Sequence, residues 1–406
     1  MSVTAPSGTD HDNFYRSAPC PATFDRLHTS GVKRSRSWER VRRATIAAAF
    51  GCVGVTFPDP VPEATAGRAL GLNTALQTAM SEYVRRARPS LPAFVELVRG
   101  QTTDDYRPNK ALVPAVLRHQ CRGYIHLDRL LRIVAEGVRV RLREPLPRQS
   151  CFPRNHPSAS ERIKVLRKNI RMEQDLFRCI VNSHTDPSDV PTPSYDHCSS
   201  LARELLRCKR ADPSHEVQVM AGDVAVVYRN ACTHSECVHL FAGYIPEDNA
   251  IVIDLSAAFG WTGYAGTYSV LGGAVAFVHG NNVDAAHPSG FYSYHWVDDH
   301  VNIVTNTGTH CADADRSLRY AMTAVLGPGT VNEDKFTGWR TRQKVLGLNF
   351  DTVRETVAMP PYKIAKAQHL VANAYNATRL SPYALRSLLG SLRHVATCVR
   401  PAQAFL

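Results

Sequence analysis

The feature that most constrains this sequence is a pair of neighbouring aspartates, Asp298 and Asp299, inside the alternating segment FYSYHWVDDHVNIV. Alternation of apolar and polar residues with a period of two predicts a β-hairpin, with the aspartates at its turn. Adjacent carboxylates repel each other, and at a hairpin tip both can face one centre, where a divalent cation would neutralise them. A simple solvated turn stays open as the alternative, because aspartate is a common turn residue.

A third carboxylate, Asp223, ends the segment VQVMAGDV, whose β-branched residues predict a strand. If this strand lies beside the hairpin, three carboxylates meet at one end of a sheet. Oxygen ligands of this type suit Mg²⁺ or Mn²⁺, which also bind phosphate oxygens. Two such ions about 4 Å apart stabilise an in-line phosphoryl transfer.

Residues 198–360 combine short strand-like segments with helical ones, and two further helices are predicted over 363–375 and 382–399. The order of strand, helix, hairpin, helix and hairpin predicts an antiparallel sheet with helices on one face, an α+β fold. The strand-like segments are HEVQVMAGDVAVV, HLFAGYIP, AIVIDLS, KVLGLNFD and ETVAM, and the helical ones are GYAGTYSVLGGAVAFVHG and ADADRSLRYAMTAVL.

The first half of the chain predicts a different organisation. Residues 1–35 are polar and predict an irregular tail, and residues 36–143 show apolar residues at helical spacing. Residues 144–197 contain two proline-rich breaks around a basic helix, ERIKVLRKNIRMEQDLFRCIV, which Ser158 and Glu161 would open as a capping box. The residues from 361 to 406 predict a separate group of helices.

Positive charge is concentrated in the first 170 residues, which hold 28 of the 48 Lys and Arg residues but only 14 of the 36 Asp and Glu residues. A basic region of this kind favours a polyanionic partner, most commonly nucleic acid. Solvated helix faces would give the same composition, so charge alone leaves both interpretations open.

The longest apolar run, Ala44 to Phe57, has fourteen residues. A membrane-spanning helix needs about 20, so the run predicts a buried core segment and no membrane partner. Eleven cysteines, an odd number, without a secretory leader favour a reducing compartment over a disulfide framework. We therefore expect an intracellular protein, of the nucleus or cytoplasm, that is not secreted.

Several other residues invite a functional interpretation. The segment CTHSECVH, Cys232 to His239, holds four candidate zinc ligands within eight residues, which is too close to surround one tetrahedral ion easily. His295 and His300 are interpreted as strand residues that flank the turn, because Mg²⁺ prefers oxygen. Asp254 predicts a strand end, and Gly272-Gly273 predicts close packing of a helix on a sheet.

Four motifs occur in the order found in reverse transcriptases. HWVDDHV resembles their aromatic-X-Asp-Asp box, and GDVAVVYRN resembles their first aspartate motif. FGWTG resembles their glycine-rich motif, and VLGLNFD resembles the hairpin that grips the primer end. Over about 198–406 the sequence is similar in particular to the polymerase of tyrosine-recombinase (DIRS-type) retrotransposons, with weaker similarity over 137–182.

This resemblance implies an RNA-directed DNA polymerase whose palm covers 198–360 and whose thumb-like helices cover 361–406. It implies an RNA template, a DNA primer and deoxynucleotides as partners, with Mg²⁺ or Mn²⁺ as cofactor. Asp223, Asp298 and Asp299 would be the catalytic carboxylates, and the carbonyl of Val224 would help to hold metal. It further implies nucleotide-binding roles for Tyr228 as steric gate, Phe259, Gly260 and Lys335, the last as an acid for the leaving pyrophosphate, and a primer grip at Leu346 and Gly347.

Three departures from the family pattern bear on activity. The stretch from about Ile180 to Tyr195, where a fingers segment with basic strands is expected, contains no Lys or Arg. Tyr264-Ala265 replaces the usual Ser-Pro, and Tyr264 is expected to crowd the template-facing groove. The sequence ends at Leu406, inside the thumb-like helices. These departures favour a degenerate or truncated copy, so two alternatives stay beside the polymerase: a catalytically inactive nucleic-acid-binding remnant, and a decayed element without a selected role.

Overall fold

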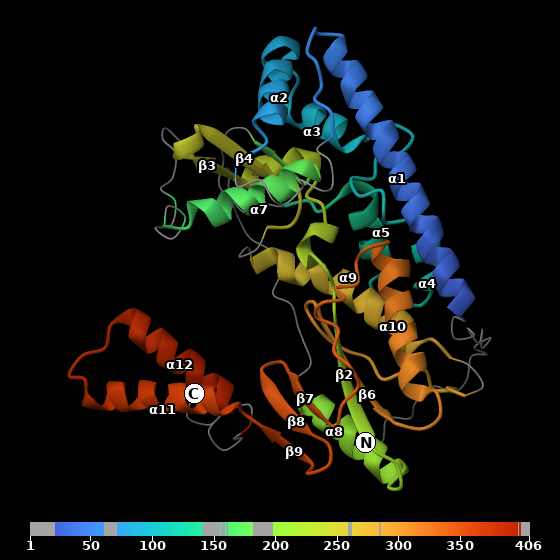
Figure 1. Cartoon of the computed structure of the whole chain (residues 1–406), viewed down its shortest axis with the longest axis vertical. Coiled ribbons are helices and arrows are strands. Elements are labelled where there is room, and N and C mark those ends of the chain that lie inside the picture. Colours follow the sequence, from blue (N-terminus) through green and yellow to red (C-terminus); the bar gives the residue numbers. More distant parts are fainter. Residues whose placement is uncertain are drawn as a thin grey trace, which may run out of the picture.

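A computed structural model describes residues 21–60, 71–140, 155, 159, 161–181, 198–258, 262–283, 286–396 and 398. The fold is α+β, as predicted: helices dominate the first part of the chain, and three small antiparallel sheets follow (Figure 1). The sheets have the strand orders β1-β4-β3, β2-β6-β5 and β7-β8-β9.

The first part of the chain is helical, in agreement with its apolar periodicity. Asn73 caps α2 by accepting a hydrogen bond from the backbone N–H of Leu76, and Ser90 caps α3 in the same way through Ala93. The helices are α1 (Pro21–Gly51), α2 (Thr74–Ala87), α3 (Leu91–Arg99), α4 (Pro114–Gln120), α5 (Leu127–Glu136) and α7 (Ile163–Asp175).

The long helix α1 begins inside the segment that was predicted to be an irregular tail, so this prediction is wrong for residues 21–35. Tertiary contacts outweigh the polar composition there, since a Cβ on Gly31 would lie 3.3 Å from the ring of Pro328. The apolar run from Ala44 forms the end of α1 and the following turn. It buries Ile46, Phe50 and Val55, whereas several of its alanines stay exposed.

The small sheet β1-β4-β3 lies beside α7 (Figure 1). Its strands are β1 (Cys179–Val181), β3 (Ala242–Ile245) and β4 (Ala250–Asp254). The basic helix was predicted to continue to residue 181, but α7 ends at Asp175 and Phe177 takes a positive φ of 54°. The residues after it pair with β4, so a strand begins where a fingers strand was expected to be missing. Residues 182–197 and Ser158 lie outside the described residues.

The central sheet places β6 (Asp299–Thr305) between β2 (Val217–Asp223) and β5 (Tyr294–Trp296). Helices α9 (Thr262–Gly280) and α10 (His310–Leu326) pack together in the largest apolar core, which includes Tyr264, Tyr268 and Leu318. Leu201 and Leu205 of α8 (Ser199–Ala211) pack in a second core with Val217 and Val219 of β2. The helices thus fix the end of the sheet at which the aspartates lie.

The third sheet and the last two helices complete the described chain. KVLGLNFD forms a tight hairpin of β7 (Arg342–Val345) and β8 (Leu348–Asp351), and β9 (Thr356–Ala358) pairs with β8. Helices α11 (Pro361–Asn376) and α12 (Pro382–Ala396) form a pair that extends to one side of this sheet (Figure 1).

Within the described residues, none of the helices is both long enough and apolar enough to cross a membrane. The nine cysteines in this part of the chain are free thiols, and three of them, Cys121, Cys179 and Cys208, are buried.

Candidate active site

The three predicted carboxylates lie at the same end of the central sheet. Asp223 is the last residue of β2 and is in register with Asp299, the first residue of β6. Cα atoms directly opposite each other in antiparallel strands are about 4.5–5.5 Å apart. Asp298 lies in the turn between β5 and β6, and its carbonyl accepts a hydrogen bond from the N–H of Val224 at 3.1 Å. The hairpin predicted from the alternating sequence therefore forms beside the strand of Asp223.

Helix α9 supports the turn from behind. A Cβ on Gly272 would lie 3.3 Å from the His295 ring and 3.4 Å from the carbonyl oxygen of Val297. Val297 takes a left-handed φ of 54°, which non-glycine residues adopt uncommonly. The predicted packing of a helix on a sheet is thus confirmed at Gly272, where it holds the turn against the helix, whereas Gly273 packs against the Tyr124 side chain, outside the sheets.

Asp223 is buried and both of its carboxylate oxygens accept hydrogen bonds. Oδ1 accepts from the amide of Asn332 at 2.6 Å, and Oδ2 accepts from Nζ of Lys335 at 3.0 Å. The Lys335 side chain is 61% exposed and that of Asp223 is 5% exposed. The lysine therefore reaches from the surface onto the carboxylate, and its predicted role as an acid for pyrophosphate stays a prediction. Asn332 was not predicted, since nothing distinguishes it in the sequence except its position three residues before Lys335.

The three carboxylates form one electrostatic cluster, because the charge of one shifts the pKa of another. Burial raises the pKa of Asp299 to about 6, with further contributions from the negative charges of Asp298 and Asp223. Burial and the charge of Asp223 also raise the pKa of Asp298, and the Lys335 ammonium opposes both shifts. The pKa of Lys335 is raised by its hydrogen bond to Asp223 and by the charges of the other two aspartates. A positive charge placed among these groups is favourable.

The donor chemistry of this cluster fits a hard divalent cation, because it offers several carboxylate oxygens at one sheet end. The positions of the side chains fit a metal ion less well than their chemistry does. Among the described residues, no three His, Cys, Asp or Glu side chains are close enough together to hold a metal ion. Lys335 already supplies positive charge to Asp223, so a cation bound there would have to share or displace that contact. The metal prediction, including the Val224 carbonyl, stays a prediction.

The residue predicted as steric gate, Tyr228, lies in the short 3-10 helix η1 (Val227–Asn230) that follows β2. Its ring packs edge-on against Tyr268 of α9, with 5.8 Å between ring centroids. Burial, and then the negative charge of Asp298, raise the pKa of its hydroxyl. Tyr228 is therefore in the electrostatic range of the aspartate turn, on the side of α9.

Two predicted nucleotide-binding residues, Phe259 and Gly260, lie outside the described residues. The helix that follows them is described, and it corrects one expectation. Tyr264 does not crowd a groove: its side chain is fully buried in the core, and its hydroxyl shares a hydrogen bond with Thr233. The larger side chain is accommodated inside the protein because the helix directs it there.

The predicted primer-grip residues form the turn between β7 and β8. Leu346 and Gly347 have φ values of 51° and 76°, so both central residues of this two-residue turn are left-handed. Two positive φ values in succession are typical of a hairpin turn that matches strand twist. Lys363 of α11 donates to the Gly347 carbonyl at 3.2 Å, which ties the hairpin to the last two helices.

Other candidate residues have structural positions. Asp254 ends β4 and pairs with Arg229, as expected for a strand end, and His295 and His300 face each other on β5 and β6. In the Cys232–His239 segment, the Cys237 thiol donates to the carbonyl of Val140, and His234 caps a 3-10 helix, η2 (Ser235–Leu240).

Comparison with known proteins gives a likeness of structure but not of sequence. No family model matches the chain, and no curated protein matches it. Among the solved structures, a foamy viral protease-reverse transcriptase in complex with double-stranded DNA matches with a TM-score of 0.44 and 10% identity, over 73% of this chain and 56% of that one. The same kind of protein in complex with an RNA/DNA hybrid matches with a TM-score of 0.42 and 10% identity, over 71% of this chain and 42% of that one. The chain thus spans about half the length of these structures.

Proposed function

We propose that this chain is the polymerase part of a reverse transcriptase from a tyrosine-recombinase (DIRS-type) retrotransposon. The observation that carries the proposal is the juxtaposition of Asp223 and Asp299 in register on neighbouring strands, with Asp298 in the adjoining turn and Lys335 on Asp223. Four sequence motifs in the order found in reverse transcriptases support it.

In this proposal the reaction is attack of a primer 3′-hydroxyl on the α-phosphate of a deoxynucleotide. A P–O bond forms to the primer, and the bond between the α- and β-phosphates breaks to release pyrophosphate. Asp223 and Asp298, with the Val224 carbonyl, would hold divalent cations, which supply charge stabilisation to the phosphoryl group when bound. Lys335 would give a proton to the leaving pyrophosphate, which its exposed ammonium can approach.

The partners in this proposal are an RNA template and a DNA primer. The hairpin at Leu346 and Gly347 would hold the primer end, and the thumb-like pair α11 and α12 would contact the duplex. Tyr228, beside the Asp298 turn, would occupy the space that a ribose 2′-hydroxyl needs, so that deoxynucleotides are preferred. The tyrosine's position against Tyr268 supports this role because it fixes the ring.

Primer extension on an RNA template with Mg²⁺ or Mn²⁺ tests the proposal, with Asp298→Ala as the variant that removes a ligand. Glu355→Ala, an exposed carboxylate in the loop before β9, is the matched control. Extension by the parent and the control, and none by Asp298→Ala, is the expected result. Extension that persists in Asp298→Ala would exclude this site as the polymerase centre.

A second candidate, a nucleic-acid-binding remnant without synthesis, is favoured by one observation. Asn332 and Lys335 already take both oxygens of Asp223, and in the described part of the chain the carboxylates form no three-ligand group. Salt-sensitive binding of primer–template without extension, from folded protein, would support this candidate.

A further inference from the structure

A pocket lies between α1, the loop that precedes α4, and the 3-10 helix η1, and none of the three carboxylates of the candidate active site lines it. The pocket has a volume of about 640 Å³, within the range of small-molecule sites. Seven Arg and Lys side chains line it, against two carboxylates, Glu39 and Asp175. We call it the basic pocket.

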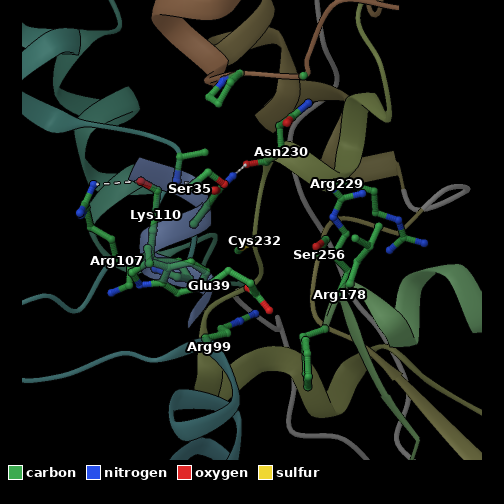
Figure 2. A pocket seen from close by; sticks show the side chains of 18 of the residues that line it. Ser35, Glu39, Arg99, Arg107, Lys110, Arg178, Arg229, Asn230, Cys232 and Ser256 are labelled. Carbon is green, nitrogen blue, oxygen red and sulfur yellow. Dashed lines mark hydrogen bonds between the residues drawn. The ribbon is translucent and has the colours of Figure 1, made fainter. Parts of the chain in front are cut away.

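The cations approach the basic pocket from opposite walls. Figure 2 shows Arg107 and Lys110 on one side and Arg178 and Arg229 on the other, with Cys232 between them. These residues are far apart in sequence, so the fold, and not a local charge run, brings the cations together. A concave surface lined by one sign of charge concentrates ions of the opposite sign.

Both lining carboxylates are already engaged. Glu39 pairs with Arg42, and Asp175 accepts hydrogen bonds from Arg171 and from the Asn73 amide, each at 2.8 Å. Neither is therefore available to balance the other cations.

Among the lining cations, Arg229 is paired twice, with Glu173 and Asp254. The remaining cations exceed their carboxylate partners. Arg107 and Lys110 share a single carboxylate, Asp105. Neither Arg34 nor Arg178 makes a side-chain hydrogen bond or ion pair with any residue in the ranges that the structure describes. Positive charge thus remains at the pocket wall without a counterion from the described chain.

Two of the lining guanidinium groups are buried as well as incompletely paired. Arg42 and Arg99 are 8% and 3% exposed, and the Nε of each has no hydrogen-bond partner. Arg99 is held in place by its Nη2, which donates to the carbonyls of Thr233 and Leu255 at 2.7 and 2.5 Å. A buried donor without a partner costs free energy, more so when it is charged. Both Nε atoms are closed to solvent, so an anion in the basic pocket would stabilise these two guanidinium groups through its charge, without contacting Nε.

Shape decides between a small anion and a nucleic-acid backbone. The basic pocket is concave and has a volume of about 640 Å³, so a short phosphate chain can enter it, whereas the convex surface of a duplex cannot. Arg forks match phosphate oxygens bidentately. We propose that the basic pocket binds a small polyphosphate anion, either free or as the tail of a nucleoside triphosphate.

The proposal does not require an active carboxylate site, so it is tested in EDTA, without divalent cations. Inorganic tripolyphosphate is titrated into the full chain by calorimetry and by tryptophan fluorescence, because Trp38 lines the pocket with its ring 4.6 Å from the Arg42 guanidinium carbon. Saturable binding of tripolyphosphate is expected. The Asp298→Asn variant should bind equally well, which separates this proposal from the polymerase test.

The decisive variant is Arg34→Gln with Arg178→Gln, and Arg210→Gln in α8 is the control that removes an exposed arginine outside the pocket. The double variant should weaken binding by about tenfold or more, because each lost contact is charge-assisted, and the control should not. Circular dichroism verifies the fold. If the double variant binds as the parent does, or if the parent does not bind tripolyphosphate, the proposal is wrong.

Two further ligands distinguish the source of the phosphate. Equal affinity for tripolyphosphate and deoxythymidine triphosphate means that the pocket recognises phosphate alone, and tighter binding of the nucleotide means that its sugar and base also make contacts. Both outcomes support the proposal. A short DNA duplex is then tested as a competitor of tripolyphosphate. If it displaces tripolyphosphate equally well from the parent and from the Arg34→Gln/Arg178→Gln variant, the proposal is wrong.

Discussion

At the scale of single residues, the absence of a side chain at Gly222 allows β2 to pack closely and to place Asp223 at the end of the sheet. A Cβ at this position would lie 2.7 Å from Leu318 and 2.7 Å from Phe336. Leu318 is in the core of α10 and cannot move away easily. Gly222→Ala should therefore lower the free energy of unfolding by about 1–3 kcal/mol, and should reduce primer extension by displacing the neighbouring carboxylate. Urea denaturation measures the first effect.

The control for Gly222→Ala is Gly243→Ala in β3. A Cβ at Gly243 would have no heavy atom within 4 Å, so its effect should stay within about 0.5 kcal/mol. Equal destabilisation by the two substitutions would mean that the cost comes from the backbone and not from the crowding around Gly222.

The raised pKa of Asp299, about 6, predicts a pH dependence of stability. Between pH 4 and pH 6 the unfolded chain has lost the Asp299 proton while the folded chain still holds it, so stability falls as the pH rises through this window. Asp299→Asn removes the titration. The melting temperature of the variant relative to the parent should therefore increase from pH 4 to pH 6 and then level off.

The comparison is made in EDTA, with Asp334→Asn as control, since Asp334 is an exposed carboxylate. A difference between Asp299→Asn and parent that does not change with pH would contradict the assignment of a raised pKa. In a separate series without EDTA, added Mg²⁺ should stabilise the parent more than the Asp299→Asn variant if the carboxylates bind the ion.

At the scale of elements, the sequence predicted those helices and strands whose formation depends on residues close together in the chain. The alternation around Asp298 predicted the β5-β6 hairpin, and apolar spacing predicted α2, because each element buries one of its faces. The start of α1 and the strand β1 could not be predicted. Both depend on partners that are distant in sequence, Pro328 for α1 and β4 for β1.

Helix α9 illustrates how close packing depends on one glycine. A Cβ on Gly273 would lie 2.5 Å from the hydroxyl oxygen of Tyr124, which donates a hydrogen bond to the Val270 carbonyl. Gly273→Ala should destabilise the protein by about 1–3 kcal/mol, although alanine favours helix. Gly390→Ala in α12, where a Cβ meets nothing within 4 Å, should instead stabilise by up to about 1 kcal/mol.

A double-mutant cycle isolates the contact between Gly273 and Tyr124. Tyr124→Phe removes the hydroxyl, so the combined variant should cost less than the sum of the two single substitutions. Urea denaturation of the four proteins gives the interaction free energy. Strict additivity would show that the destabilisation by Gly273→Ala arises elsewhere on the helix.

At the scale of the whole molecule, the charge distribution predicted a polyanion partner but not where the charge lies. The basic pocket draws its cations from α1, α3, the loop before α4, the residue before β1, and η1, so no single segment of the sequence reveals it. The carboxylate site is different, because two of its members are adjacent and the third ends a recognisable strand. A site built from neighbouring residues can be predicted, whereas one assembled by tertiary packing cannot.

The net charge of +12 predicts a steep salt dependence for binding of primer–template. If a duplex neutralises about five cations of the chain, log K should fall with log[salt] with a slope of about −4.5. The affinity would then decrease several hundred-fold between about 50 and 200 mM salt. Fluorescence anisotropy with a labelled RNA–DNA duplex measures this slope, and a slope shallower than about −1 would contradict an electrostatic interface.

The same titration locates the interface. Lys366 in α11 and Arg386 in α12 are exposed on the helices proposed to contact the duplex. Replacement of both by glutamine should make the slope shallower by about two, one for each lost phosphate contact. Arg210→Gln should leave the slope unchanged, because Arg210 is exposed on α8, a helix that is not proposed to contact the duplex. Equal effects of the two sets of variants would mean that the duplex responds to total charge, and that the thumb-like helices are not its contact surface.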